Sequence, residues 1–178
     1  MKGNLLLHSD GGSRGNPGPA ASAFVVEKNG KIIFSQSKYL GVQTNNVAEY
    51  FGVNMALKWL KKYSDLNVVD KVIFYLDSLL VTNQLNGIYK IKSESLKKYY
   101  LSIKELEKKI KSKITYQHVY RQKNKMADLL VNKCLNKNFT LVKAFNKWST
   151  TWNKNNFHVG DKIFTKKINW YNAVIYLR

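Results

Sequence analysis

The chain has 178 residues, and its 30 Lys and Arg against 11 Asp and Glu give a formal net charge of +19. This length predicts one domain with a small appendage, and 44% hydrophobic residues exclude a wholly disordered basic tail. No apolar run approaches the roughly 20 residues that span a bilayer, and no secretory signal is visible, so we expect a soluble, cytoplasmic protein without a membrane partner. The single cysteine, Cys134, excludes an internal disulfide and a cysteine-based zinc site.

The positive charge is concentrated in the second half of the chain. Residues 1–87 carry nine basic and six acidic side chains, residues 88–128 twelve and four, and residues 129–178 nine and one. An excess of this size favours a polyanionic partner, most simply nucleic acid. A general compositional bias toward Lys and Asn is the alternative explanation, and the sequence leaves it open.

The N-terminal part of the chain predicts three antiparallel strands. Residues 4–9 form a short apolar run that ends at Asp10, and the segment from Gly11 to Pro19 has the glycine, serine and proline content of a turn. Two further β-prone runs, residues 20–27 and 31–39, flank the pair Asn29-Gly30, which is a strong hairpin signal.

Helices and buried strands alternate through the next part of the chain. Residues 47–63 carry apolar side chains at helical spacing, behind Thr44 as a candidate N-cap. Residues 68–76 form a continuous apolar run, typical of a central strand, that ends at Asp77. Further helices are predicted over 78–85, 95–111 and 125–136, and a strand over 113–120. This order predicts an α/β fold with a five-stranded mixed sheet, three antiparallel strands followed by parallel strands, flanked by helices.

The segment from residue 139 to 178 scatters aromatic side chains among lysines and asparagines. We expect a helical stretch followed by a hairpin there. Two hypotheses for these aromatic side chains stay open. They can stack on bases beside lysine–phosphate contacts, or they can dock onto the core and cover its edge, which is the commoner use of scattered aromatic residues.

Two aspartates occupy corresponding places in the predicted sheet. Asp10 and Asp77 each follow an apolar strand, and strand ends of this kind face a common edge where α/β proteins place their sites. Carboxylates gathered at one edge repel each other unless a hard divalent cation binds between them. Glu49 and Asp128 lie in the first turns of two predicted helices and can point to the same edge. The alternative for each acid, strongest for Asp128, is a helix cap or a surface salt bridge.

Four blocks of the chain, each carrying one of these acids, follow one another in a fixed order. They run from Asp10 to Ala20, Thr44 to Tyr50, Asp77 to Gly87 and Arg121 to Asp128. Together they resemble the four motifs of type 1 ribonuclease H. The resemblance spans residues 4 to about 138, and it implies a ribonuclease H-like catalytic domain over residues 1–138 with a basic aromatic extension over 139–178.

This resemblance implies an activity and a set of site residues. Members of the family hydrolyse the RNA strand of RNA/DNA hybrids with two Mg²⁺ or Mn²⁺ ions, leaving a 5′-phosphate and a 3′-hydroxyl. The implied metal ligands and catalytic residues are Asp10, Glu49, Asp77 and Asp128, with Asp10 as the candidate bridging ligand. Two ions suit in-line attack of water on a phosphodiester, because one activates the nucleophile while the other neutralises the leaving oxygen. Carboxylates are also better magnesium ligands than imidazole or thiolate.

An enzyme that cuts only the RNA strand of a hybrid must sense 2′-hydroxyl groups. The residues that the resemblance assigns to substrate binding are Gly11, Gly12, Ser13, Asn16, Thr44, Asn45, Asn46, Asn83 and Arg121. Asn16 has an alternative role as a turn residue before Pro17. Lysines at 90, 92, 97 and 98 are candidates for phosphate contacts, against the alternative of an ordinary solvated face.

The chain departs from many relatives in the loop over residues 120–123, where Arg121 stands in place of a histidine in the compact Arg-x-x-Asn form of the family. His8 is predicted to pack, and His118 to be a packed or edge-strand histidine, rather than to replace that histidine. The alternative function is a catalytically idle nucleic-acid-binding or structural subunit of a nucleoprotein or replication assembly. We expect a monomer, and leave open double-stranded RNA as a substrate and a polymerase or nucleoprotein partner for residues 139–178.

Overall fold

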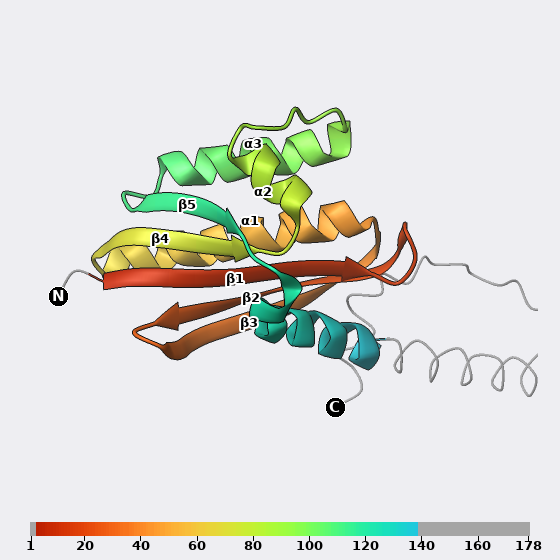
Figure 1. The fold of residues 1–178 in the computed structure, drawn as a ribbon, viewed down its shortest axis with the longest axis horizontal. Coiled ribbons are helices and arrows are strands. Elements are labelled where there is room, and N and C mark those ends of the chain that lie inside the picture. Colours follow the sequence, from red (N-terminus) through yellow and green to blue (C-terminus); the bar gives the residue numbers. More distant parts are fainter. Residues whose placement is uncertain (1–2, 139–178) are drawn as a thin grey trace, which may run out of the picture. The chain divides into compact units, whose positions relative to one another are not determined.

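The computed structural model of the chain describes residues 3–138 (Figure 1). The helix and hairpin expected after residue 139, and any role for that extension, lie outside the described residues. Within residues 3–138, no helix combines the length and the apolar composition needed to cross a bilayer.

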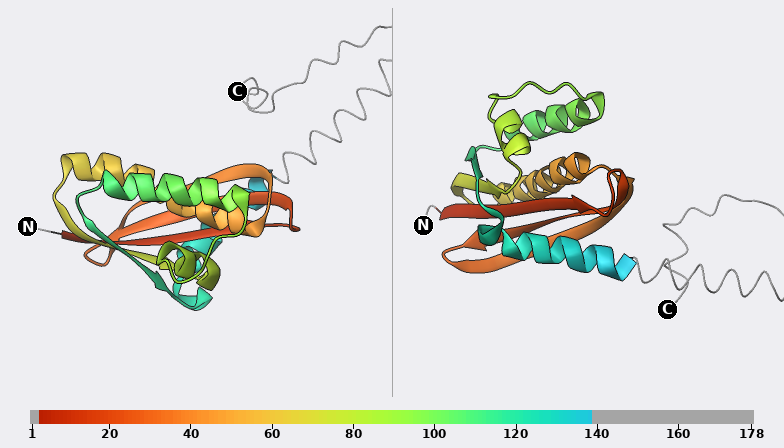
Figure 2. Two further views of the ribbon diagram at one scale, coloured as in Figure 1. Left: turned by 90° about the horizontal axis from the view of Figure 1, so that it is seen from above. Right: turned by 45° about the vertical axis from the view of Figure 1, so that its right-hand side comes forward.

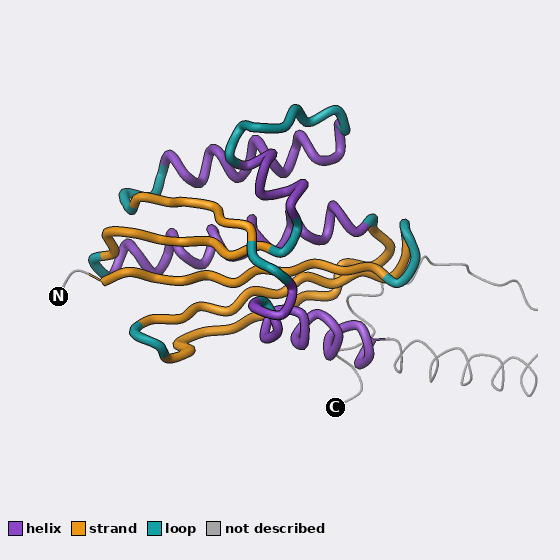
Figure 3. Tube along the Cα trace, in the orientation of Figure 1, coloured by secondary structure: helices purple, strands orange, loops and turns teal. Residues whose placement is uncertain are grey.

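The centre of the fold is one sheet of five strands with the order β3-β2-β1-β4-β5. The strands are β1 (Gly3–Ser13), β2 (Gly18–Lys28), β3 (Lys31–Gln43), β4 (Val69–Leu76) and β5 (Lys113–His118). The first three pair antiparallel, whereas β1, β4 and β5 pair parallel. The predicted mixed sheet is therefore confirmed, and Figure 3 shows its strands side by side.

The hairpin between β2 and β3 forms at the predicted Asn-Gly pair. Asn29 and Gly30 have φ angles of 53° and 74°, so both adopt the left-handed conformation of a two-residue turn that matches the twist of a hairpin. β3 then continues to Gln43, beyond the predicted end at Tyr39, because β2 supplies a partner as far as the Gly18–Gln43 pair.

Among residues 3–138, four helices accompany the sheet, in the predicted order. They are α1 (Asn45–Leu66), α2 (Leu79–Leu85), α3 (Glu94–Lys108) and a last helix over residues 125–138, which follows a 3₁₀ turn at Arg121–Lys123. The Thr44 side chain caps α1 by accepting a hydrogen bond from the Val47 N–H, as predicted. α3 ends before the predicted Lys111, because the chain turns there to bury Ile110 and to let the Ser112 hydroxyl donate to the Val69 carbonyl.

The two faces of the sheet are covered by different helices (Figure 2). Side chains alternate along β2, so that Phe24 and Val26 face the main core with α1, whereas Ala21 and Ala23 face the helix over residues 125–138. The main core contains large side chains from β1, β4, α1 and α3, and the second cluster is small. The sheet is thus thickly covered on one face and thinly on the other.

α1 lies unusually close to β1 because each element places a glycine at the contact, Gly11 on β1 and Gly52 on α1. A Cβ on Gly11 would lie 2.2 Å from the backbone of Ala48 and Glu49, and one on Gly52 would lie 2.6 Å from the Ser9 Oγ atom. Only glycine allows backbones to approach this closely. The contact places the first turns of α1, and Glu49 with them, directly against β1 at Gly11.

The end of the β1–β4 pairing corrects one expectation about Asp10. Parallel pairing stops at Ser9–Leu76, yet β1 continues to Ser13 because β2 still pairs with it antiparallel. Asp10 therefore lies inside a strand rather than at its end, and Gly11, Gly12 and Ser13 belong to that strand rather than to a turn. Because β4 has ended, the edge of β1 beside Asp10 is open to other side chains.

Candidate active site

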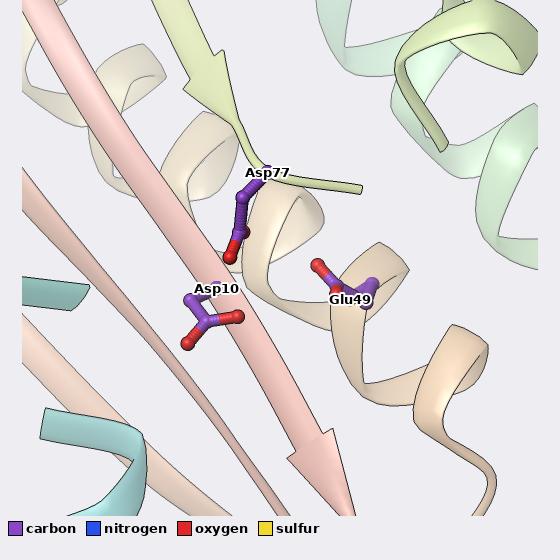
Figure 4. A group of neighbouring side chains, drawn as sticks. All are labelled: Asp10, Glu49 and Asp77. Carbon is purple, nitrogen blue, oxygen red and sulfur yellow. The ribbon is translucent and has the colours of Figure 1, made fainter. Parts of the chain in front are cut away.

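Three carboxylates converge at the open edge of β1. Asp10 comes from β1, Glu49 from the first turns of α1, and Asp77 from the residue that follows β4. One oxygen of each lies within 4.8 Å of the others. Figure 4 shows the three side chains pointing toward one another from separate elements. The sequence-based expectation that these acids face a common edge is met for these three residues.

The environment of this trio disfavours negative charge. Burial raises the pKa of Asp10 to about 7, and the charge of Asp77 acts in the same direction. The Gly11 N–H donates to Asp10 Oδ1 at 2.8 Å and partly opposes that shift. Burial, with Asp10 and Asp77 nearby, also raises the pKa of Glu49 well above its usual range. The fold therefore keeps these carboxyl groups close together even though their negative charges repel each other.

Asp128 lies at the rim of the site rather than within the trio. Its Oδ1 accepts a hydrogen bond from the Arg121 guanidinium at 2.5 Å and one from the Asn132 side chain at 3.2 Å. The ion pair with Arg121 is the surface salt bridge that the alternative interpretation of Asp128 expects. Asp128 nevertheless shares one cavity with the three acids, and its charge contributes to raising the pKa of Asp10.

The acids open into a cavity of about 290 Å³. Among the residues predicted to bind substrate, its walls include Gly11, Gly12, Ser13, Asn45 and Arg121. The other predicted residues, Asn16, Thr44, Asn46 and Asn83, are not part of these walls. Arg14, Val131, Asn132 and Leu135 complete the walls together with the four acids. The cavity thus joins the sheet edge to the last helix.

Asn16 and Asn45 tie the turn after β1 to the start of α1. The Asn45 N–H donates to Asn16 Oδ1 at 3.0 Å, and the Ser13 N–H donates to Asn45 Oδ1 at 3.3 Å. Asn16 therefore has the structural role of a turn residue that the sequence also allowed. Its predicted contact with substrate stays a prediction, as do those of Thr44 and Asn46 in the same region.

The remaining candidates lie farther from the acids. The Asn83 carbonyl accepts hydrogen bonds from the Ile88 and Tyr89 N–H groups and closes the turn after α2. The four candidate phosphate-binding lysines, Lys90, Lys92, Lys97 and Lys98, are all exposed. His8 is half-buried beside Tyr75, with ring centroids 5.1 Å apart, and burial lowers its pKa. His118 is exposed on β5 and contacts Tyr120.

Two asparagines near the acids were not assigned a role from sequence. Asn132 lies one helical turn after Asp128 and donates to both its carbonyl and its carboxylate. Asn124 precedes the last helix, is buried, and donates to Asp77. Asn132 could have been found from its i, i+4 spacing to Asp128 on the predicted helix. Asn124 could have been found as a candidate N-cap of that helix.

The donor set of the site fits hard divalent cations. Three carboxylates with mutually close oxygens offer only oxygen ligands, which Mg²⁺ and Mn²⁺ prefer. A bound cation would also offset the repulsion that raises the pKa values of Asp10 and Glu49. Residues 3–138 show no comparable cluster of His, Cys, Asp and Glu side chains elsewhere.

The described domain is similar to several known proteins. A family model described as reverse transcriptase-like matches residues 8–134. A bifunctional protein of Mycobacterium tuberculosis is 35% identical over 130 residues, which are 72% of this chain and 34% of that protein. This chain thus spans about a third of the length of that relative. Ribonuclease HI of Halobacterium salinarum is 35% identical over 134 residues, which are 75% of this chain and 65% of that enzyme.

A solved structure extends the similarity to the whole of a related chain. LC11 ribonuclease H1, crystallised in complex with an RNA/DNA hybrid, is 35% identical with a TM-score of 0.73. The match covers 76% of this chain and 99% of that one.

Proposed function

Because this chain belongs to the ribonuclease HI-like family, we propose that it hydrolyses the RNA strand of RNA/DNA hybrids endonucleolytically, leaving a 5′-phosphate and a 3′-hydroxyl. The observation that carries the proposal is the convergence of Asp10, Glu49 and Asp77, within 4.8 Å, from three separate elements. Two Mg²⁺ or Mn²⁺ ions are the cofactors of the proposed reaction, and Asp128 is the fourth proposed ligand.

The proposed roles of the acids follow from their surroundings. Bound divalent cations would activate water for in-line attack and neutralise the leaving 3′ oxygen. Asp10 is the proposed bridging ligand, and the Gly11 N–H orients one of its oxygens. With its pKa raised to about 7, the Asp10 carboxyl must release a proton in part of the molecules before it ligates metal at neutral pH. Arg121 and Asn132 hold Asp128 at the rim, where it completes the ligand set.

The cavity walls supply the proposed contacts to the RNA strand. Gly12 and Ser13 line the cavity, and the Asn45 amide, whose oxygen accepts from the Ser13 N–H, carries N–H donors suited to a ribose 2′-hydroxyl. The solved hybrid complex of the related enzyme supports this substrate class. The net charge of +19 supplies the long-range attraction for a polyanion.

A cleavage assay tests the proposal directly. The full chain, a hybrid labelled at the RNA 3′ end, and Mg²⁺ or Mn²⁺ should give shorter RNA fragments, while the DNA strand stays intact. The new RNA ends should carry 5′-phosphates, detectable by their sensitivity to a 5′-phosphate-dependent exonuclease. Absence of cleavage with both metals would contradict the proposal. Parallel reactions with double-stranded RNA would establish whether the substrate range extends beyond hybrids.

A matched pair of variants assigns the activity to the acid trio. Asp10→Asn keeps the shape of the side chain and removes its charge, so turnover should fall to the level of a reaction without enzyme, while hybrid binding persists. Asp70→Asn makes the same change at an exposed position on β4 and should leave turnover unchanged. Retained cleavage by Asp10→Asn would place the catalytic site elsewhere.

The alternative, an idle nucleic-acid-binding or structural subunit, is less consistent with the site. Holding Asp10 and Glu49 together in a buried place costs free energy, and their charge repels a phosphate backbone. A protein that only binds nucleic acid gains nothing from that cost. Hybrid binding without cleavage under either metal would favour the alternative. A monomeric state, and a polymerase or nucleoprotein partner for residues 139–178, stay predictions.

A further inference from the structure

Asn124 is a buried polar residue at the junction between the strands and the last helix. It follows the 3₁₀ turn at Arg121–Lys123, and only 1% of its surface is exposed. Its Nδ2 atom donates to Asp77 Oδ1 and to the Ser9 carbonyl, each at 2.9 Å. One side chain thus binds a candidate metal ligand and the last residue of β1 that pairs with β4.

The surroundings of Asn124 define which way its amide points. Its nitrogen meets two oxygens, so a flipped amide would set its own oxygen against two acceptors. The Oδ1 atom is buried without a hydrogen-bond partner of ordinary geometry among residues 3–138, and its polar neighbour is the His8 imidazole. Removing the side chain would therefore leave the Asp77 carboxylate without this donor.

The backbone of Asn124 makes a third connection to the site. Its carbonyl accepts a hydrogen bond from the Asp128 N–H at 3.2 Å, in the first turn of the last helix. Asp128 is carried by a helix that packs on the sheet through only a small apolar cluster. Asn124 thus connects Asp77 at the strand edge to the helix that carries Asp128.

We propose that Asn124 is a positioning residue that orients Asp77 toward Asp10 and fixes the Asp128 helix relative to the strands, so that the four acids bind metal as one set. The inference rests on the proposed metal-dependent function. Its physical basis is that Asp77 is repelled by two neighbouring carboxylates, and a fixed donor on Oδ1 opposes its rotation away from them. Mutating a residue that hydrogen-bonds to a metal ligand typically lowers metal affinity by about 10- to 100-fold.

Metal binding, measured apart from turnover, tests this role. The full chain, Asn124→Ala and Asn54→Ala would each be titrated with Mn²⁺ by isothermal calorimetry without nucleic acid. Asn54 is the matched control, because it is also buried but donates to Ser102 between α1 and α3. Asn124→Ala should bind Mn²⁺ at least about tenfold more weakly and need more metal for half-maximal cleavage. Asn54→Ala should keep the affinity of the unmodified chain, and hybrid binding in EDTA should be equal for all three.

The outcomes separate this inference from the function on which it rests. Equal Mn²⁺ affinity for Asn124→Ala and the unmodified chain would overturn the positioning role alone, whereas absence of Mn²⁺ binding to the unmodified chain would overturn the proposed function as well. If Asn124→Ala does not fold, NMR of the unmodified chain decides. The Asn124 side-chain amide protons should exchange slowly with solvent and shift on Mg²⁺ addition, while those of Asn54 should not shift. Asn124 signals that are insensitive to Mg²⁺ would overturn the inference.

Discussion

The two faces of the sheet hold their helices by different means. On one face α1 packs through a core of large side chains, among them Phe24, Tyr50 and Leu57, and it touches β1 at Gly11. On the other face the last helix packs through Val131 and Leu135 on two alanines of β2, and Tyr39, Leu130 and Cys134 lie partly buried around them. Both faces contribute acids to one cavity, but only the first fixes its acid through a large apolar core.

The difference separates two kinds of ligand positioning. Glu49 is fixed because its helix cannot move without opening the main core, and backbone contact with β1 sets its distance from Asp10. Asp128 depends on hydrogen bonds and an ion pair with Arg121, Asn132 and the Asn124 carbonyl. We expect the trio of Asp10, Glu49 and Asp77 to behave as a preformed cluster. Asp128 and its hydrogen-bond partners should form an adjustable group.

Truncating one leucine on each face gives the largest expected difference. Leu57→Ala empties a fully buried position beside the sheet and should lower the free energy of unfolding by about 4 kcal/mol, whereas Leu135→Ala should cost about 2 kcal/mol, because the thin layer can collapse onto the gap. Urea denaturation followed by circular dichroism measures both. Equal losses would mean that the two faces are equally rigid.

Adjacent glycines on β1 probe the same contrast at the backbone. Gly11→Ala would push a methyl group into the α1 backbone at 2.2 Å and should destabilise the fold by about 3 kcal/mol, with loss of cleavage as Glu49 moves. Gly12→Ala meets only the Val131 side chain at 3.3 Å, which can shift, so it should cost about 1 kcal/mol or less. Thermal denaturation and hybrid cleavage would be measured on both. A Gly12→Ala variant as unstable as Gly11→Ala would contradict the proposed softness of the second face.

The pH dependence of stability tests whether the trio of Asp10, Glu49 and Asp77 is held together against charge repulsion. A carboxyl group whose pKa is higher in the folded chain than in the unfolded chain opposes folding once it ionises. The pKa of Asp10, raised from 3.8 to about 7, therefore predicts that metal-free stability falls by about 2 to 4 kcal/mol as pH rises through this window. The melting temperature in EDTA should decrease from pH 4 toward pH 8, and Mg²⁺ should raise it more at the higher pH.

The Asp10→Asn variant is the control for this pH effect. It removes one of the repelling charges, so its metal-free melting temperature at neutral pH should exceed that of the unmodified chain, and its pH dependence should be flatter. A variant with an unchanged pH profile would show that the trio is not the source of the effect.

The smallest expected effect concerns the adjustable group. The Arg121 side chain is 73% exposed, and exposed ion pairs contribute little, so Arg121→Ala should change the free energy of unfolding by less than about 1 kcal/mol. Cleavage should nevertheless need more Mg²⁺, because Asp128 loses a partner that holds it at the rim. Arg121→Lys keeps the charge, so its Mg²⁺ requirement should lie between those of the unmodified chain and Arg121→Ala. A stability loss as large as that of Leu57→Ala would show that the second face is not held loosely.

The order of elements was predictable because each has a local signal. Thr44 marks the start of α1, Asn29 and Gly30 mark the hairpin, and the apolar runs before Asp10 and Asp77 mark the two central strands. The convergence of Asp10 and Asp77 was predictable from their places after two apolar runs of one sheet, and that of Glu49 from its place in the first turns of a predicted helix.

Features that the sequence did not predict arise from pairings between distant parts of the chain. Gly11, Gly12 and Ser13 have the composition of a turn, but β2 holds them in a strand through pairing that composition does not encode. Gly11 is required by the approach of α1, which a glycine-rich pattern does not distinguish from a loop. Asn124 resembles an ordinary helix cap, and its role depends on Ser9 and Asp77 lying beside it in the folded chain.

The acid cluster inside a strongly basic chain also couples the binding of cations to the binding of nucleic acid. A phosphate backbone is drawn to the protein from a distance, yet meets three clustered carboxylates at the cavity. Bound divalent cations would replace the repulsion between carboxylates and phosphates by attraction. Cation and hybrid must therefore tighten each other's binding by the same factor. The cellular concentration of free divalent ions would thereby determine how strongly the protein retains a hybrid as well as how fast it cuts one.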